Sequence, residues 1–389
     1  MAVYIIILLV SLFLFPGKYS MYSPEYNFTL CTMYIVLLVY YLFRQKAYFK
    51  NWLRIDVLFL LGYTIVHFQI PFLLTFDIEP LMGNRVLINK GLINYATWMS
   101  LVAINLWIIG YSLVIKERIK QSKNRNDNNF KVNYVLFDTL LLLSFFLFVG
   151  VVGSPFLIDR VYDGGRSWGE GANYANLMLR ILLYLRIAYF FKDVPKQISV
   201  SQLFIRLLKY RIFAFVLISY FLLFLRVGDR GPVMAILFIV AGLYVLYIRP
   251  ISFSRLILFS FLGAFVMTLI AFGRSREAQG NSNVIERGYS AYMSAENKVN
   301  FTEELASSVR MQYYAIELVP DHHPYLYGVS FFSQIFSIIP FGSFVLKDIL
   351  GIPVTYYASS TFLNIVIQGE NYDSGMGTEI LADIYINFG

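Results

Sequence analysis

Long apolar segments are the feature that most constrains what this chain can fold into. A helix needs about 20 apolar residues to cross the hydrocarbon core of a bilayer. The composition agrees, because only 14% of the residues are charged, whereas a soluble domain carries about 25%. A soluble globular enzyme is therefore excluded, and the sequence predicts one all-α domain, a polytopic bundle of about 9–11 transmembrane helices. Nine clear apolar segments cover roughly residues 2–15, 27–43, 55–76, 92–115, 132–152, 174–191, 212–227, 232–248 and 256–273.

The distribution of lysine and arginine predicts the orientation. With the N-terminus in the cytoplasm, the inner loops 44–54, 116–131, 192–211 and 249–255 hold 17 basic residues, against 7 in the outer loops with Arg226 at their rim. This excess fits the positive-inside rule. The first segment lacks a basic leader and a small-residue cleavage site, so we expect it to be a retained helix rather than a signal peptide.

The pattern changes after the ninth segment. Residues 274–327 form the longest polar stretch and are predicted to be a large extracytoplasmic loop, in which 284–319 has helical composition. Residues 328–346 are apolar but contain Pro340 and Gly342, which leaves a tenth span or a re-entrant segment open. A further helix begins near the end of the printed sequence, which suggests a chain truncated within that helix.

Common catalytic signatures are missing from the sequence. It contains no P-loop, no HExxH and no GxSxG motif. The adjacent His322 and His323 cannot alone supply three zinc ligands, and Cys31 has no second cysteine to pair with. We therefore expect no metal, no cofactor and no nucleic-acid partner.

Arginines at the predicted outer surface stand out instead. Arg226 and Arg230 flank a short turn after the seventh segment, and Arg274 and Arg276 follow the ninth. A guanidinium pairs bidentately with phosphate oxygens, so these residues would suit a bound pyrophosphate. The alternative is that they are interface anchors that extend into the headgroup region.

Several of these segments together resemble the O-antigen polysaccharide polymerases of the Wzy type. They are residues 226–240 around GDRG, the RSRE after the ninth segment, IPFG at 339–342, and the final GMGTEILADIYINFG. The resemblance covers roughly residues 130 to 389, and family members continue past the final motif with further spans. In the last run the residues that carry it are Gly375, Gly377, Thr378, Glu379, Tyr385, Asn387, Phe388 and Gly389.

The resemblance implies an integral-membrane glycosyltransferase of the bacterial cytoplasmic membrane, similar to the O-antigen ligases. Such an enzyme transfers a glycan from undecaprenyl pyrophosphate to a new lipid-linked repeat unit at the outer face of that membrane, without a metal. A chain-length regulator and a flippase are the protein partners expected beside the bilayer. The resemblance makes Arg230 the first candidate for stabilising the leaving pyrophosphate and Arg274 and Arg276 the second.

The acceptor hydroxyl needs a base or an orienting group. His322 and His323 are the candidate catalytic residues, with solvated loop histidines as the alternative. Glu370 and Asp373 are candidate substrate ligands in a turn-prone run. Glu379 and Asp383, four residues apart and so predicted to share one helix face, could face the glycan or complement the helix dipole.

Other charged residues lie within or beside the apolar segments. Arg226, Arg166 and Arg180 are candidate substrate-binding residues, with surface or interface roles as the alternative. Arg186 is expected to snorkel, and His67 to be a satisfied interior histidine.

A flippase or transporter of lipid-linked oligosaccharide is the competing function. Such proteins usually contain related halves and charges near the bilayer midplane. The sequence has no clear halves and has one dominant outer loop, which favours an outward-facing enzyme. A sensor or scaffold is a third possibility, but no cytoplasmic output domain supports it.

Overall fold

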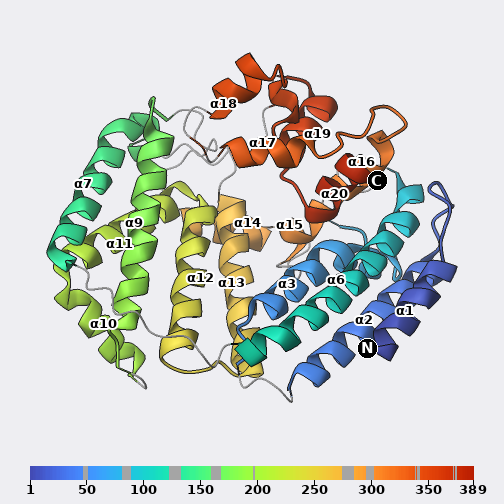
Figure 1. The fold of residues 1–389 in the computed structure, drawn as a ribbon, viewed down its shortest axis with the longest axis horizontal. Coiled ribbons are helices and arrows are strands. Elements are labelled where there is room, and N and C mark those ends of the chain that lie inside the picture. Colours follow the sequence, from blue (N-terminus) through green and yellow to red (C-terminus); the bar gives the residue numbers. More distant parts are fainter. Residues whose placement is uncertain are drawn as a thin grey trace. The chain divides into compact units, whose positions relative to one another are not determined.

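The structure is a computed structural model that describes residues 1–46, 51–80, 89–121, 133–158, 168–195, 198–273, 284–294, 302–337, 339, 342–370, 372 and 375–389. Within these ranges every regular element is helical, so the predicted all-α class is confirmed (Figure 1).

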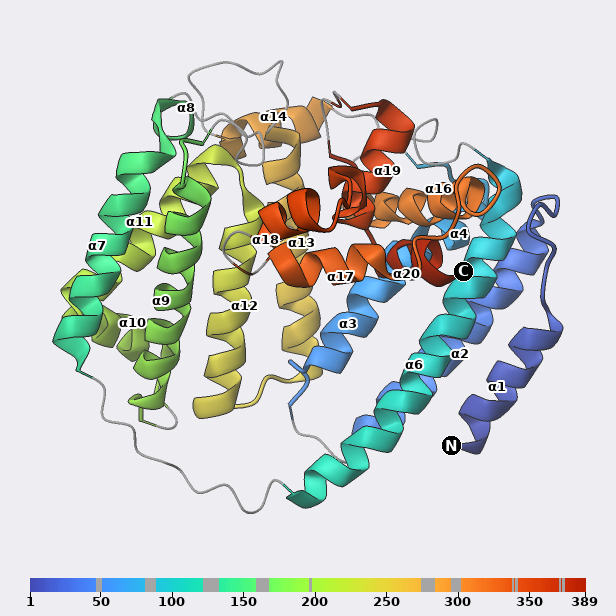
Figure 2. The same ribbon diagram turned by 45° about the horizontal axis from the view of Figure 1, so that its top comes forward.

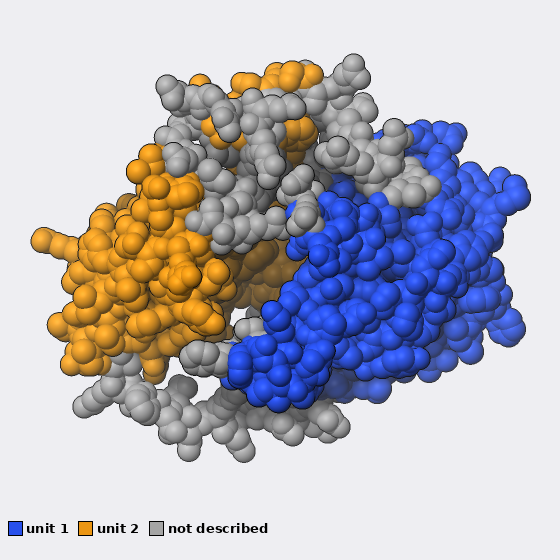
Figure 3. Space-filling model, turned by 90° about the horizontal axis from the view of Figure 1, so that it is seen from above, with its two compact units in different colours: residues 1–47, 59–125, 302–389 blue, residues 48–58, 126–301 orange. Residues whose placement is uncertain are grey.

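The chain divides into two compact units, which are coloured separately in Figure 3. Unit 2 comprises Tyr48–Leu58 and Asn126–Phe301. Unit 1 comprises Met1–Ala47, Phe59–Arg125 and Thr302–Gly389. Unit 1 therefore packs the C-terminal segment with the first apolar helices of the chain.

Seven helices in the described ranges are long and apolar enough to span a membrane, so the chain is a multi-pass membrane protein. Of the other two predicted spans, α1 has 12 residues and is too short. Helix α11 (Arg211–Val227) has 17, at the lower limit for a span, and it passes the same test together with the preceding helix, from which it is bent by 111°. The seven are Pro24–Lys46, Ile55–Leu74, Lys90–Val114, Tyr134–Val152, Ala172–Lys192, Arg230–Tyr247 and Phe253–Ile270.

Unit 1 is built on helices that run side by side in Figure 2, with α6 packed against both α1 and α2. The span that begins with α3 contains a π-helical turn, η1, before it continues as α4. The C-terminal helices α16 and α20 pack against each other, and α16 also contacts α6. The bounds are α1 (Ala2–Phe13), α2 (Pro24–Lys46), α3 (Ile55–Tyr63), η1 (Thr64–Phe68), α4 (Gln69–Leu74), α6 (Ile93–Gln121), α15 (Glu303–Ala306), α16 (Arg310–Leu318), α17 (Val329–Ser337), α18 (Gly342–Phe344), α19 (Ser359–Gln368) and α20 (Ile380–Phe388).

Unit 2 has an aromatic-rich core between α7, α9, α11 and α12. The prediction that Arg186 snorkels is wrong. The side chain is 1% exposed, and its Nε lies 2.6 Å from Asp138 Oδ1. Three aromatic rings surround its guanidinium, so the ion pair joins α9 to α7 inside the unit. The bounds are α7 (Tyr134–Val152), α8 (Ser154–Leu157), α9 (Ala172–Lys192), α10 (Val200–Lys209), α12 (Arg230–Tyr247), α13 (Phe253–Gly273) and α14 (Val284–Ser294).

The predicted loops contain more helix than the sequence analysis assigned. The segment 192–211, predicted to be an inner loop, holds α10, which was not predicted. Helices α14, α15 and α16 confirm the helical composition of 284–319. In 328–346 the longest described helix is α17, whose nine residues extend about 14 Å. This is too short for the tenth span that the sequence left open.

Candidate functional site

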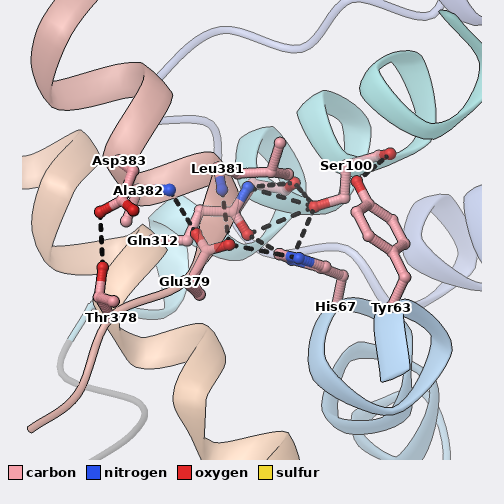
Figure 4. Close-up of polar contacts among 10 residues, drawn as sticks. Tyr63, His67, Ser100, Gln312, Thr378, Glu379, Leu381, Ala382 and Asp383 are labelled. Atoms are coloured by element: carbon pink, nitrogen blue, oxygen red, sulfur yellow. Dashed lines mark hydrogen bonds and ion pairs between the residues drawn. The ribbon is translucent and has the colours of Figure 1, made fainter. Parts of the chain in front are cut away.

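A buried ionisable pair lies inside unit 1, where His67 meets Glu379 (Figure 4). Their exposed fractions are 2% and 8%. His67 lies in the π-helical turn η1, and such turns occur frequently at functional sites. An ionisable residue buried within a membrane-spanning helix is expensive and is by default a candidate functional residue.

Glu379 reaches His67 because it caps α20 rather than belonging to it. Its carboxylate accepts hydrogen bonds from the backbone N–H groups of Leu381, at 2.7 Å, and Ala382, at 2.5 Å. Its Oε2 also lies 3.3 Å from His67 Nε2. Burial raises the pKa of the Glu379 carboxyl to about 8, against the opposing effect of the two N–H donors, and the Asp383 carboxylate adds to the rise.

Gln312 and Ser100 determine which nitrogen of the His67 ring carries a proton. Gln312 Nε2 donates to the Ala96 carbonyl at 3.1 Å, which places Gln312 Oε1 3.2 Å from His67 Nδ1. An amide oxygen is an acceptor, so Nδ1 carries a proton and Nε2 faces Glu379. Ser100 Oγ, 2.8 Å from the same carbonyl, bridges Gln312 and His67.

The geometry requires a proton between His67 and Glu379. A ring nitrogen and a carboxylate oxygen 3.3 Å apart would present lone pair to lone pair if neither were protonated. The pair therefore shares one proton, and the proton belongs to the pair rather than to one residue. Such a centre can hold a proton inside the bundle and release it.

The pair predicts how stability depends on pH. An unfolded chain loses the proton of His near pH 6.5 and that of Glu near pH 4.3, whereas the folded pair keeps one proton up to about pH 8. Between about pH 6.5 and about pH 8 the folded state holds one proton more than the unfolded chain, so the free energy of unfolding should fall with rising pH by up to about 1.4 kcal/mol per unit in that window. Unfolding of the detergent-solubilised protein at several pH values measures this slope. Glu379→Gln should flatten it, and an equal slope in both proteins would contradict the assignment.

The residues of the final motif build the structure next to this pair. Asn387 is fully buried, and its side-chain amide donates to Ser330 Oγ and to the Asp383 carbonyl. Its Oδ1 accepts from the Gly328 N–H at 3.0 Å. The backbone of α20 also accepts hydrogen bonds from the N–H groups of Leu326 and Tyr327. The motif therefore holds the segment before α17 in place.

That segment forms a surface concavity of about 470 Å³. Its two histidines differ, because His322 is exposed and His323 is half-buried. His323 Nδ1 donates to the Pro324 carbonyl at 2.9 Å, which leaves Nε2 as an acceptor 3.4 Å from the Tyr356 hydroxyl. This tautomer is the one that a general base needs. The concavity is lined by Pro320, Asp321, His322, His323, Pro324, Tyr325 and Tyr327.

An ion pair connects the concavity to the N-terminal part of unit 1. Asp321 lies 2.8 Å from Lys18 Nζ and accepts a hydrogen bond from the Tyr19 hydroxyl at 2.5 Å. These hydrogen bonds lower the pKa of the Asp321 carboxyl, so it stays ionised at neutral pH. The concavity is therefore lined by one carboxylate, two imidazoles and two tyrosine rings.

Three of the predicted arginines are described, and all belong to unit 2. Arg226 is exposed in the last turn of α11, and Arg230 is the first residue of α12. Between them Gly228 has φ 84°, and the Asp229 side chain accepts from the Gly231 N–H at 3.1 Å. The turn therefore holds both arginines at adjoining helix ends, as the sequence predicts. Arg180 is half-buried in α9, and its Nε has no hydrogen-bond partner among the described residues.

The remaining predicted site residues are in part described by the structure and in part outside the described residues. Glu370 is exposed just after α19, and its role as a substrate ligand stays a prediction. Glu379 and Asp383 do not share one helix face, because Glu379 precedes the helix and Asp383 accepts from Thr378 Oγ1 at 2.6 Å (Figure 4). Arg166, Arg274, Arg276 and Asp373 lie outside the described residues.

The pairing of His67 with Glu379 was not predicted from the sequence. His67 was expected to be a satisfied interior histidine, and its ring is indeed hydrogen-bonded. The partner is a carboxylate from a distant part of the chain, and the signal that could have found it is an ionisable side chain inside an apolar segment. Among the described residues, no group of three or more His, Cys, Asp or Glu could hold a metal ion.

Comparison of the chain with models of known protein families, with curated proteins and with solved structures gave no match.

Proposed function

We propose that this protein is a polysaccharide polymerase that joins oligosaccharide repeat units carried on undecaprenyl pyrophosphate. The observation that carries the proposal is the concavity at residues 320–327. The run that resembles the polymerases frames it, through Asn387 and the backbone of α20. Tyrosine rings, a carboxylate and an imidazole with an acceptor nitrogen are suitable groups for binding a sugar and activating its hydroxyl.

The proposed reaction transfers the growing glycan to an acceptor sugar. The acceptor hydroxyl oxygen attacks the anomeric carbon of the donor, and the bond between that carbon and the pyrophosphate oxygen breaks. The hydroxyl proton passes to His323 Nε2, for which the ring has the required tautomer. Undecaprenyl pyrophosphate leaves with the bonding electron pair.

The turn between α11 and α12, which belongs to unit 2, carries arginines that by themselves suit a pyrophosphate. Arg230 lies in the first turn of α12, where the positive end of the helix dipole favours an anion. Arg226 adds a second guanidinium four residues earlier. Fixed donors of this kind stabilise charge that develops in a transition state.

A transporter or flippase of lipid-linked oligosaccharide is the second candidate, because the His67–Glu379 pair favours it. Ionisable residues buried in membrane-spanning helices mark proton relays in pumps and transporters, and His67 lies in such a helix. In that case the shared proton would couple to substrate movement, and the concavity would be an entry or exit site.

Deletion of the gene in its host, followed by electrophoresis of the surface polysaccharide, tests the two candidates against each other. A ladder that collapses to a single-repeat band is the result expected for a polymerase, because units still cross the membrane without being joined. Loss of all surface glycan, with lipid-linked units retained inside, would identify a flippase instead. An unchanged ladder would contradict both functions.

A further inference from the structure

Helix α10 has an apolar face that protein does not cover. Its residues Val200, Phe204, Ile205 and Leu208 are between 46% and 62% exposed. None of the ten residues of α10 is buried. Four large apolar side chains exposed on one short helix are unusual for a surface that faces water.

The helix is strongly amphipathic. At 100° of rotation per residue, Val200, Phe204 and Leu208 fall within about 80° of one another. The edge of this apolar arc, Leu203 and Leu207, packs on the core of unit 2. Lys209 and Gln202 lie on the opposite side of the helix.

The direction of α10 separates it from the span that follows. The axes of α10 and α11 form an angle of 111°, with the break at Tyr210. A helix nearly perpendicular to a span runs along the membrane plane rather than through it. Helix α10 also begins with its own capping box, in which Ser199 and Gln202 exchange side-chain and backbone hydrogen bonds.

Basic residues surround the polar side of the same helix. Lys209 and Arg211 are exposed at its C-terminal end, and Lys192 is exposed at the end of α9. Arg206 donates to the Asp193 carbonyl at 2.8 Å, which ties α10 to the end of α9. The charges therefore lie where headgroup phosphates would lie if the apolar arc faced the acyl chains.

We propose that α10 is an interfacial helix whose apolar face, formed by Val200, Phe204 and Leu208, is inserted into one leaflet of the bilayer. Lys209 and Arg211 then contact the phosphates of the lipid headgroups. The partner of this surface is the lipid itself and not a second protein. The proposal does not depend on the polymerase function.

Depth-dependent quenching in nanodiscs of phosphatidylcholine and phosphatidylglycerol tests the proposal on the full chain. Cys31 is the single cysteine and is 1% exposed, so Cys31→Ser gives a background for single cysteines at positions 200, 204 and 208. A bimane label at each site reports quenching by brominated acyl chains. Lys209→Cys is the matched control on the polar side.

The three apolar positions should be quenched equally, and roughly twofold or more above position 209, because an interfacial helix buries its apolar face about 5–10 Å below the headgroups. Water-soluble iodide should give the reverse order. Quenching that changes steadily from 200 to 208 would mean that α10 enters the bilayer end-on, as part of a broken span, and would overturn the proposal. Weak quenching by both reagents would mean that protein covers the face, and would also overturn it.

Discussion

A strain that carries Arg230→Ala is expected to make surface glycan with a single repeat and no ladder. Arg230 occupies the first turn of α12, where a guanidinium and the positive end of the helix dipole can act on the same anion. Removal of one such donor in other enzymes lowers the rate by about 10²–10³. A loss of that size would abolish visible polymer, and electrophoresis of the glycan measures it.

Two variants control for the arginine itself. Arg230→Lys should also be impaired, because an ammonium does not reproduce the bidentate fork of the guanidinium. Arg249→Ala removes an arginine just beyond the other end of α12 and should leave the ladder unchanged. Polymer of normal length in a well-expressed Arg230→Ala strain would show that Arg230 does not act on the donor.

Glu379→Ala should destabilise the protein by about 3 kcal/mol. The substitution leaves His67 without its carboxylate partner, and breaking a buried ion pair costs about 3–5 kcal/mol. It also removes the acceptor for the N–H groups of Leu381 and Ala382, which begin α20. Thermal or denaturant unfolding of the protein in detergent measures the loss.

The controls separate the charge of Glu379 from its hydrogen bonds. Glu379→Gln keeps one oxygen, for the Ala382 N–H, and an amide that can donate to His67, but it loses the acceptor for the Leu381 N–H, so it should cost less than alanine while still costing something. Glu370→Ala removes an exposed carboxylate and should change stability by no more than about 0.5 kcal/mol. Equal losses in the glutamine and alanine variants would mean that packing, rather than hydrogen bonding, holds this position.

The membrane helices could be predicted because apolar length is a local property of the sequence. The seven spans of the structure all overlap predicted apolar segments. The short helix α10 was missed, although its apolar residues at spacings of three and four and the Ser199–Gln202 box are visible in the sequence. The basic residues of 192–211 were interpreted only as a sign of membrane orientation, so the helical pattern among them was not considered.

The candidate site was less predictable, because its contacts join distant parts of the sequence. Arginines at helix ends can be recognised from neighbouring residues, as Arg226 and Arg230 were. The environment of Arg186 cannot be recognised in this way, because Asp138 and the surrounding rings come from other parts of the chain. The same reason applies to His67 and Glu379, which meet only when the segment after residue 302 packs on the first spans.

The π-helical turn at Thr64–Phe68 accommodates one residue more than an α-helical turn would. One residue corresponds to about 100° of rotation, so the faces presented by α3 and by α4 belong to two different helical registers. Deletion of one residue within this turn would join them into one continuous α-helix. Either Tyr63 would keep its hydrogen bond to the Ser100 carbonyl, or Gln69 its contact with Thr302, but not both. The extra residue thus lets a single span match two neighbours whose spacing a regular helix could not satisfy.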